Sequence, residues 1–325
     1  MTSRYWRGPV SDHFDGTRFH GPGPRAPDKT LADLRRWRRT QAPARWPRRV
    51  AIVRDVPPPR VEGDAIRVSL IGHATVLLQT AGLNILFDPV FSDRASPVAF
   101  AGPRRVTEPG VALADLPPLD AICVSHNHYD HMDVASLARL ARTRPCPLFT
   151  TLGNIAPLPR AVRAATREMD WGESAALAPG VTLRCQGAYH WSSRGWFDRR
   201  RALWGSFVVT TPTRKIWFAA DTAFEDGALF DDLRARHGGF DLALIPIGAY
   251  APRWFMKDQH VDPFEAVRIF QMVGARQAVA IHWGVFQLTD EPRDEPPRLL
   301  AQALAEAGVA AERFPAPEPG TALVY

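Results

Sequence analysis

The chain has 325 residues, of which 40 are Lys or Arg and 34 are Asp or Glu, and its formal charge is +6. A hydrophobic content of 46% with 23% charged residues is ordinary for a globular protein and excludes a disordered or fibrous chain. No stretch approaches the roughly 18 apolar residues of a membrane-spanning helix, so the sequence predicts no integral membrane protein.

The positive charge is concentrated near the N-terminus. Residues 1–49 hold 12 cationic and 4 anionic side chains, a net charge of +8, so the other 276 residues carry −2. Arginine supplies 37 of the 40 cations, and its guanidinium group can bind phosphate through two hydrogen bonds. We therefore expect 1–60 to be an Arg- and Pro-rich arm packed on the body, with peripheral membrane contact as one role. A codon bias toward Arg, Ala and Pro explains the composition equally well.

Three cysteines, Cys123, Cys146 and Cys185, lie far apart and form no Cys-x-x-Cys pair. This usage predicts a reducing compartment and no disulfide framework. The first residues lack the apolar core of a signal peptide. We therefore expect a cytoplasmic protein, with the arm as its contact to the inner membrane surface, while the oligomeric state does not follow from the sequence.

The body is predicted to contain clusters of strands with helices between them. Two apolar runs, 68–80 and 83–90, are separated by the turn Ala81-Gly82 and predict a pair of strands. Further strands are predicted at 119–125, 181–187, 204–211, 215–220, 241–248 and 277–283. Helices are predicted at 31–40, 133–143, 226–237, 263–273 and 296–307. This pattern favours two packed sheets covered by helices.

The helix at 263–273 has a strong start signal. Asp262 is a capping residue, Pro263 suits the first turn, and Glu265 follows the cap by three residues. In the arm, Trp6, Trp37 and Trp46 predict contact with the body, because exposed tryptophan is unfavourable.

Four potential metal ligands follow the 119–125 strand within six residues: His126, His128, Asp130 and His131. In an extended loop His126 and His128 point the same way, while Asp130 and His131 face another side. One such loop can serve two metal ions. A polar surface loop with incidental histidines is the less favoured interpretation.

Three more candidates follow predicted strands, namely His190, Asp221 and His282. Each alone is a weak signal, but with the loop they make five histidines and two aspartates. Imidazole and carboxylate without thiolate suit Zn²⁺ best, with Fe or Mn as alternatives.

With these residues the chain resembles the metallo-β-lactamase-fold hydrolases, in the branch of the N-acyl-phosphatidylethanolamine-hydrolysing phospholipase D. The segments that carry the resemblance are IGHATVLL, LFDPVFS, SHNHYDH, HWSSR, ADT, HVDPFEAV and HWGVF, between Ile71 and Phe286. The resemblance implies an α/β (α+β) fold, a four-layer αββα sandwich, with a single catalytic domain at 61–325. It also implies a two-metal site at one edge of the sandwich.

The resemblance further implies a role for each candidate. The first of two Zn²⁺ ions would be held by His126, His128 and His190, the second by Asp130, His131 and His282, with Asp221 bridging both. Asp88 would orient the ligand loop from outside the metal shell, and His73 would pack behind the site. His260 would contact the phosphate or assist proton transfer, and water held by Asp130 or His260 would protonate the leaving alkoxide.

The implied activity is that of a phosphodiesterase of the phospholipase D type, acting on N-acyl-phosphatidylethanolamine-like or other amphiphilic phosphodiesters. A hydroxide shared by two metal ions would attack phosphorus. Aromatic residues near the ligands predict a substrate pocket lined by Tyr189, Trp191, Trp254 and Trp283. Tyr189 stands where the branch commonly has Gln, and Ala223-Phe224 where it has Gly-Tyr, so the substrate stays open.

Three alternatives remain. A lactonase or another acyl hydrolase, acting on a sugar-phosphate lactone or a β-lactam, would use the same metal site. A nuclease is less favoured, because the body is net negative. A metal-dependent binding protein is disfavoured, because a structural site needs only four ligands. His13, His20 and His237 join no constellation and are expected at the surface.

Overall fold

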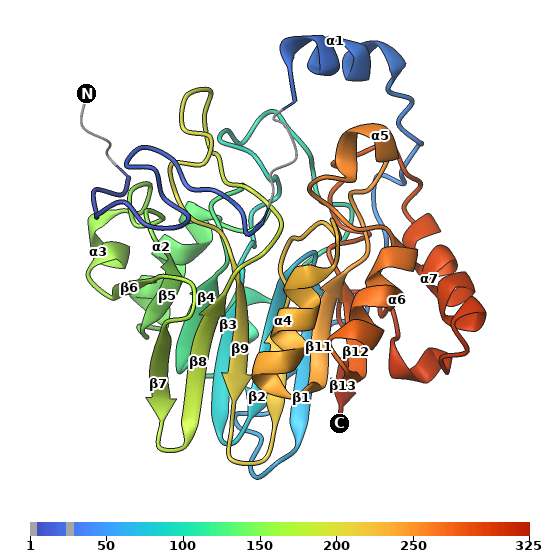
Figure 1. Ribbon diagram of the computed structural model, residues 1–325. Helices are drawn as coiled ribbons and strands as arrows, with labels where there is room; N and C mark the ends of the chain where they lie inside the picture. Colours follow the sequence, from blue (N-terminus) through green and yellow to red (C-terminus); the bar gives the residue numbers. More distant parts are fainter. Residues whose placement is uncertain (1–4, 24–28) are drawn as a thin grey trace.

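The computed structural model describes residues 5–23 and 29–325, and the first of its two sheets has seven strands (Figure 1). Their order is β13-β1-β2-β3-β4-β5-β6. The bounds are β1 Ile66–Gly72, β2 Thr75–Thr80, β3 Leu83–Phe87, β4 Ala121–Val124, β5 Leu148–Thr151, β6 Thr166–Met169 and β13 Ala322–Val324. Pairing is antiparallel from β13 to β3 and parallel from β3 to β6. Every residue of β2 to β5 is buried, so both faces of this sheet are covered.

The second sheet has six strands in the order β12-β11-β10-β9-β8-β7. Their bounds are β7 Ser174–Ala178, β8 Val181–Gln186, β9 Ser206–Thr210, β10 Lys215–Phe218, β11 Phe240–Pro246 and β12 Ala275–Ile281. The strands β10, β11 and β12 run parallel, and the others pair antiparallel. The strands predicted from apolar runs in this half of the chain are confirmed.

Helices cover the outer faces of both sheets (Figure 1). The helices are α1 Leu31–Thr40, α2 Val134–Thr143, α3 Arg160–Arg163, α4 Ala228–His237, α5 Arg253–Met256, α6 Pro263–Met272 and α7 Glu295–Glu306. One apolar cluster joins the inner faces of the two sheets, a second joins α2 to the first sheet, and a third joins α4, α6 and α7 to the second. These clusters give the four layers αββα, and the predicted fold is confirmed.

The start of α6 agrees with its sequence signal. The Asp262 side chain accepts a hydrogen bond from the Glu265 backbone N–H at 2.9 Å, and the Glu265 carboxylate accepts one from the Asp262 N–H at 3.2 Å. This capping box, with Pro263 in the first turn, fixes where the chain enters the helix. The residues immediately before it, among them His260, are therefore held in a defined place.

The first predicted strand pair needs a correction. The run 68–80 is two strands, because the chain turns between Gly72 and Thr75. Gly72 has φ +143° and His73 has φ +56°, and the register of β1 against β2 shifts between Leu70 and Gly72. Apolar residues continue through the turn, so the sequence pattern conceals it. The short strands β5, β6, β7 and β13 and the short helices α3 and α5 were also not predicted.

The N-terminal arm lies against the body. Phe19 is fully buried in a cluster with Leu203 and Trp204. The Trp37 ring stacks on Phe255 with 5.1 Å between centroids, and Trp46 donates its indole N–H to the Glu291 carbonyl at 2.9 Å. Among the described residues, no helix is long and apolar enough to cross a membrane.

The expectation that His13 lies at the surface is wrong. His13 is buried, its Nε2 lies 2.8 Å from an Asp170 carboxylate oxygen, and its ring stacks on Trp171 at 4.6 Å. The carboxylate partner, 157 residues away in sequence, explains why no local pattern indicated this burial.

Candidate metal centre

The candidate ligands meet at one edge of the sandwich because they follow strands that end there. The His126–His131 loop follows β4, His190 follows β8, Asp221 follows β10, and His282 directly follows β12. Carboxyl ends of parallel strands lie at the same edge of a sheet, which is where α/β proteins gather site residues. The seven residues predicted as metal ligands are brought together within two neighbouring groups.

The first donor group consists of His126, His128, His190 and Asp221, each of which offers one ligand atom within 4.8 Å of the others. Nδ1 of His128 lies 2.9 Å from Nε2 of His126 and 3.2 Å from Nε2 of His190. Nε2 of His190 lies 3.4 Å from Asp221 Oδ2. Three imidazoles and one carboxylate therefore converge on a small volume.

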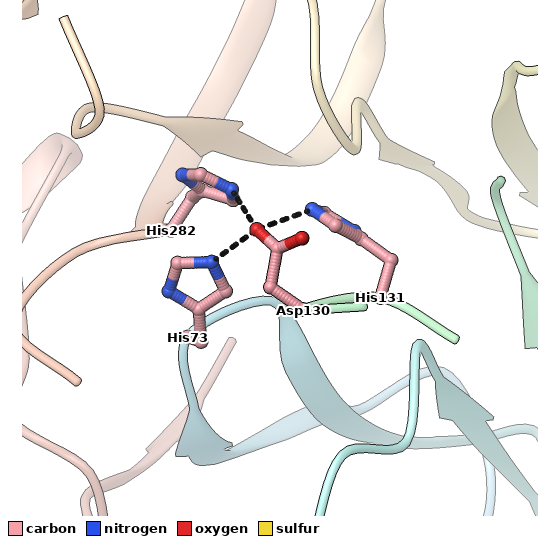
Figure 2. Close-up of side chains that lie close together, drawn as sticks. All are labelled: His73, Asp130, His131 and His282. Atoms are coloured by element: carbon pink, nitrogen blue, oxygen red, sulfur yellow. Dashed lines mark hydrogen bonds and ion pairs between the residues drawn. The ribbon is translucent and has the colours of Figure 1, made fainter. Parts of the chain in front are cut away.

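The second donor group consists of His73, Asp130, His131 and His282. Figure 2 shows the three imidazoles directed at one oxygen of the Asp130 carboxylate. Asp130 Oδ2 lies 3.1 Å from Nε2 of His73, 3.3 Å from that of His282 and 3.6 Å from that of His131. Sequence reasoning predicted three of these as ligands and placed His73 behind the site, so it missed that His73 enters the group.

Asp221 stands between the two groups. Its carboxylate lies 3.2 Å from Nε2 of His131 and 3.1 Å from Nε2 of His282, in addition to its approach to His190. It also belongs to a third set of potential ligands with His260 and His282, and Nδ1 of His260 lies 3.9 Å from Asp221 Oδ2. One carboxylate is therefore in reach of both donor groups.

Partners outside the donor groups fix the orientation of several rings. Asp88, fully buried with φ +41°, accepts a hydrogen bond from His131 Nδ1 at 2.7 Å and from the Ser125 backbone N–H at 2.7 Å. Nδ1 of His190 donates to the Gln259 carbonyl at 2.9 Å. Such partners select the tautomer that leaves Nε2 free to bind a metal ion. Asp88 thus contacts the ligand loop at Ser125 and His131, while its anchoring role stays a prediction, and Gln259 is a partner that the sequence did not indicate.

The pKa values distinguish His131 and His282 from the other four histidines of the two donor groups. Burial lowers the pKa of all three histidines of the first group, to about 3 at His128. In the second group burial lowers the pKa of His73 to about 4, but at His131 and His282 the Asp221 and Asp130 carboxylates outweigh burial. They raise the pKa of His282 to about 9 and that of His131 well above its ordinary value. Without a metal ion, protons on the second group offset the buried negative charge.

The donor atoms fit a metal ion better than they fit one another. Nε2 of His131, Nε2 of His282 and Oδ1 of Asp221 are buried and have no hydrogen-bond partner among the described residues. Buried polar atoms are nearly always paired, so several unpaired ones at one point indicate an absent group. The donors are imidazole and carboxylate, whereas the buried Cys123 and Cys185 lie in the apolar core. This set suits Zn²⁺, Fe or Mn.

The four aromatic residues predicted to line the pocket occupy different places. The Trp191 ring lies 4.6 Å from that of His128, and its indole N–H donates to Gln259 Oε1 at 2.6 Å. Trp254 lies on α5. Tyr189 and Trp283 are packed in the apolar cluster beneath the second sheet. Of the four, Trp191 directly adjoins the donor groups.

Comparisons with known proteins concern the family and the fold of the chain. Residues 83–283 match the family described as "Beta-lactamase superfamily domain". The chain is 39% identical over 244 residues to N-acyl-phosphatidylethanolamine-hydrolyzing phospholipase D 1 of Caenorhabditis elegans, covering 71% of this chain and 68% of that protein. It is 34% identical over 252 residues to the mitochondrial enzyme of the same name from Saccharomyces cerevisiae, covering 74% of this chain and 52% of the yeast protein.

Among solved structures, a metallo hydrolase of the archaeon Ignicoccus hospitalis is similar, with a TM-score of 0.60 and 18% sequence identity. The match covers 80% of this chain and 98% of the archaeal one. At this identity the likeness concerns the fold. Of the two phospholipase D relatives named above, the chain spans about two thirds of the nematode protein and half of the yeast protein.

Proposed function

Because the chain belongs to the β-lactamase superfamily and is a metal-dependent hydrolase, we propose that it hydrolyses phosphodiester bonds of amphiphilic lipids in the manner of a phospholipase D. The observation that carries the proposal is the pair of donor groups joined by Asp221. Two relatives named as N-acyl-phosphatidylethanolamine-hydrolysing phospholipases D support the choice of the phosphodiester bond.

The donor groups supply sites for two metal ions. His126, His128 and His190 would hold the first, Asp130, His131 and His282 the second, and Asp221 would contact both. Ions at these positions would make water a stronger nucleophile and offset negative charge on the phosphoryl oxygens. Zn²⁺ is our proposal for both ions, on the donor chemistry alone.

His260 is placed to act on the substrate. Its ring lies 5.1 Å from that of His190 and 5.4 Å from that of His282, and its Nδ1 is buried without a hydrogen-bond partner. Arg253 donates to the His260 carbonyl at 2.8 Å and to Glu265 at 2.8 Å, which ties the residue to the start of α6. We assign His260 to bind a phosphoryl oxygen or to relay a proton.

The proposed reaction is a hydrolysis at phosphorus. Water adds to phosphorus, the bond from phosphorus to the acylethanolamine oxygen breaks, and phosphatidic acid remains. The leaving alkoxide needs a proton, which Asp130 or His260 would pass on after it leaves the water. Asp130 belongs to the second donor group and His260 adjoins Asp221 and His282, so neither needs a large movement.

An exposed aromatic loop beside the site supports a lipid substrate. Trp196 is 91% and Phe197 89% exposed, and they lie on the connection between β8 and β9 that also carries His190. Asp198 holds this loop, because its carboxylate accepts hydrogen bonds from the Gly195 N–H at 2.8 Å and from the Tyr5 hydroxyl at 2.5 Å. Two aromatic side chains held out in water are suited to a membrane interface.

The arm adds charge at the same end of the molecule. Helix α1 and the β8–β9 connection both rise beyond the strand ends (Figure 1). On α1, Arg35, Arg38 and Arg39 are exposed, as are Leu31 and Leu34. Arginines beside apolar side chains favour an anionic lipid surface, where each basic residue contributes about 1 kcal/mol. We propose that this end of the molecule docks on such a surface and so brings the site to its substrate.

A comparison of three bonds tests the proposed chemistry. The chelator-stripped chain, reloaded with Zn²⁺, should hydrolyse bis-p-nitrophenyl phosphate faster than a lactone or nitrocefin, and chelation should remove the activity. His260→Gln should lower the rate, whereas His237→Gln, at the end of α4 and away from the donor groups, should not. Faster turnover of the lactone or nitrocefin would replace the phosphodiesterase by an acyl hydrolase.

A further inference from the structure

His73 reaches the second donor group from the turn between β1 and β2. Its Nε2 lies 3.1 Å from Asp130 Oδ2, its side chain is 2% exposed, and its ring lies 3.9 Å from that of His282 (Figure 2). We propose that His73 is a positioning residue, which donates its Nε2–H to Asp130 and thereby sets the affinity of the second donor group for its metal ion. This inference rests on the proposed metal assignment and is independent of the substrate.

The backbone of the turn directs this side chain into the site. His73 has φ +56°, a left-handed conformation that costs about 1–3 kcal/mol for a residue other than glycine. The register shift between Leu70 and Gly72 precedes it, and such bulges re-aim side chains next to active sites. The His73 carbonyl also accepts the His282 backbone N–H at 2.9 Å. A glycine would adopt this conformation without strain, whereas the chain has an imidazole side chain here.

The contacts of His73 favour an orienting role over direct binding of the ion. His131 and His282 each approach both Asp130 and Asp221, within 3.6 Å and 3.3 Å respectively. Among the described residues, His73 forms no ion pair with Asp221. His131 and His282 thus reach both carboxylates, whereas the carboxylate that His73 contacts is that of Asp130.

The hydrogen-bond chemistry also favours an orienting role for His73. An ionised carboxylate only accepts hydrogen bonds, so the ring nitrogen at 3.1 Å must carry the proton. Nδ1 of His73 is buried without a partner among the described residues, and in this tautomer it is a lone pair and not a stranded N–H donor. His73 thus does for Asp130 what Asp88 does for His131, namely fix a carboxylate or ring that binds metal.

The test compares variants that keep or remove the donor. His73→Phe fills the space without an N–H, and His73→Gln keeps a terminal N–H at a similar reach. Zn²⁺ binding to the stripped full chain is followed by competition with a fluorescent chelator, which resolves two equivalents. His73→Phe should weaken the second equivalent about 10–100-fold and leave the first unchanged. His73→Gln and the control His237→Gln should stay within about threefold of the parent.

A double-mutant cycle separates this role from that of a direct ligand. In an Asp130→Asn background His73→Phe should have little further effect, because His73 acts through that carboxylate. A further tenfold loss in that background, equal loss in His73→Gln and His73→Phe, or no loss in His73→Phe would each overturn the proposal. If the phenylalanine variant does not fold by circular dichroism, His73→Ala takes its place in the cycle. A chain that cleaved no phosphodiester would still give the predicted binding result.

Discussion

Metal binding to the two donor groups should release different numbers of protons. In the metal-free chain Asp221 and Asp130 outweigh burial, raising the pKa of His282 to about 9 and that of His131 well above its ordinary value. Both rings are therefore protonated at pH 7, and each must lose its proton before Nε2 can coordinate a metal ion. The second group should release about two protons. The first group should release about none, because burial keeps its three histidines neutral.

The number of protons released sets the direction and the size of the pH dependence of metal affinity. Raising the pH removes the protons beforehand, so the affinity of the second equivalent should rise with pH until the pKa of about 9 at His282 is reached. Two protons correspond to about 100-fold per pH unit, or about 2.7 kcal/mol, whereas the first equivalent should be nearly flat above pH 6.5. Titration calorimetry in buffers of different ionisation enthalpy measures the protons released. Equal release in both steps, or a second affinity independent of pH, would contradict the assignment.

Three further predictions concern the bridge, the rim and the arm. Asp221→Asn should weaken both metal equivalents, by at least about 10-fold each, as measured by competition with a chelator; loss of one equivalent alone would argue against a shared carboxylate. Replacing Trp196 and Phe197 by Ser should reduce sedimentation with anionic vesicles and leave hydrolysis of bis-p-nitrophenyl phosphate unchanged, and equal loss of both would count against a docking loop. Phe19→Ala should lower the free energy of unfolding by about 3–5 kcal/mol in a urea titration, since the ring is fully buried, and a loss below 1 kcal/mol would mean that the arm adds no stability.

Elements with strong local signals could be predicted from the sequence. Helix α6 carries a capping box and a proline in its first turn, and β11 and β12 are long apolar runs. The strands β5, β6 and β7 are four or five residues long and the β6 and β7 patterns are half exposed, so periodicity has too few residues to act on. The turn at His73 escaped prediction because a positive φ leaves no mark on the pattern of apolar residues.

In the candidate site, too, residues with a local sequence signal could be predicted and those that depend on distant partners could not. The contiguous run from His126 to His131 indicates metal ligands by itself, and His282 gains meaning by following a strand. The role of His73 depends on Asp130, 57 residues away, and on a bulge that aims the ring. A Gly-His pair inside a β-rich run is the available signal, since glycine permits the turn. Local sequence patterns do not indicate contacts between residues that lie so far apart in the chain.

Hydrolysis of N-acyl-phosphatidylethanolamine in ¹⁸O-labelled water tests the central claim most directly. The Zn²⁺-loaded chain, acting on mixed micelles, should release acylethanolamine without label and place one ¹⁸O in the phosphate of phosphatidic acid, because water attacks phosphorus. Mass spectrometry of both products locates the label. Label in a released fatty acid, with the phosphodiester intact, would show that the same donor groups serve acyl hydrolysis and would contradict the proposed function.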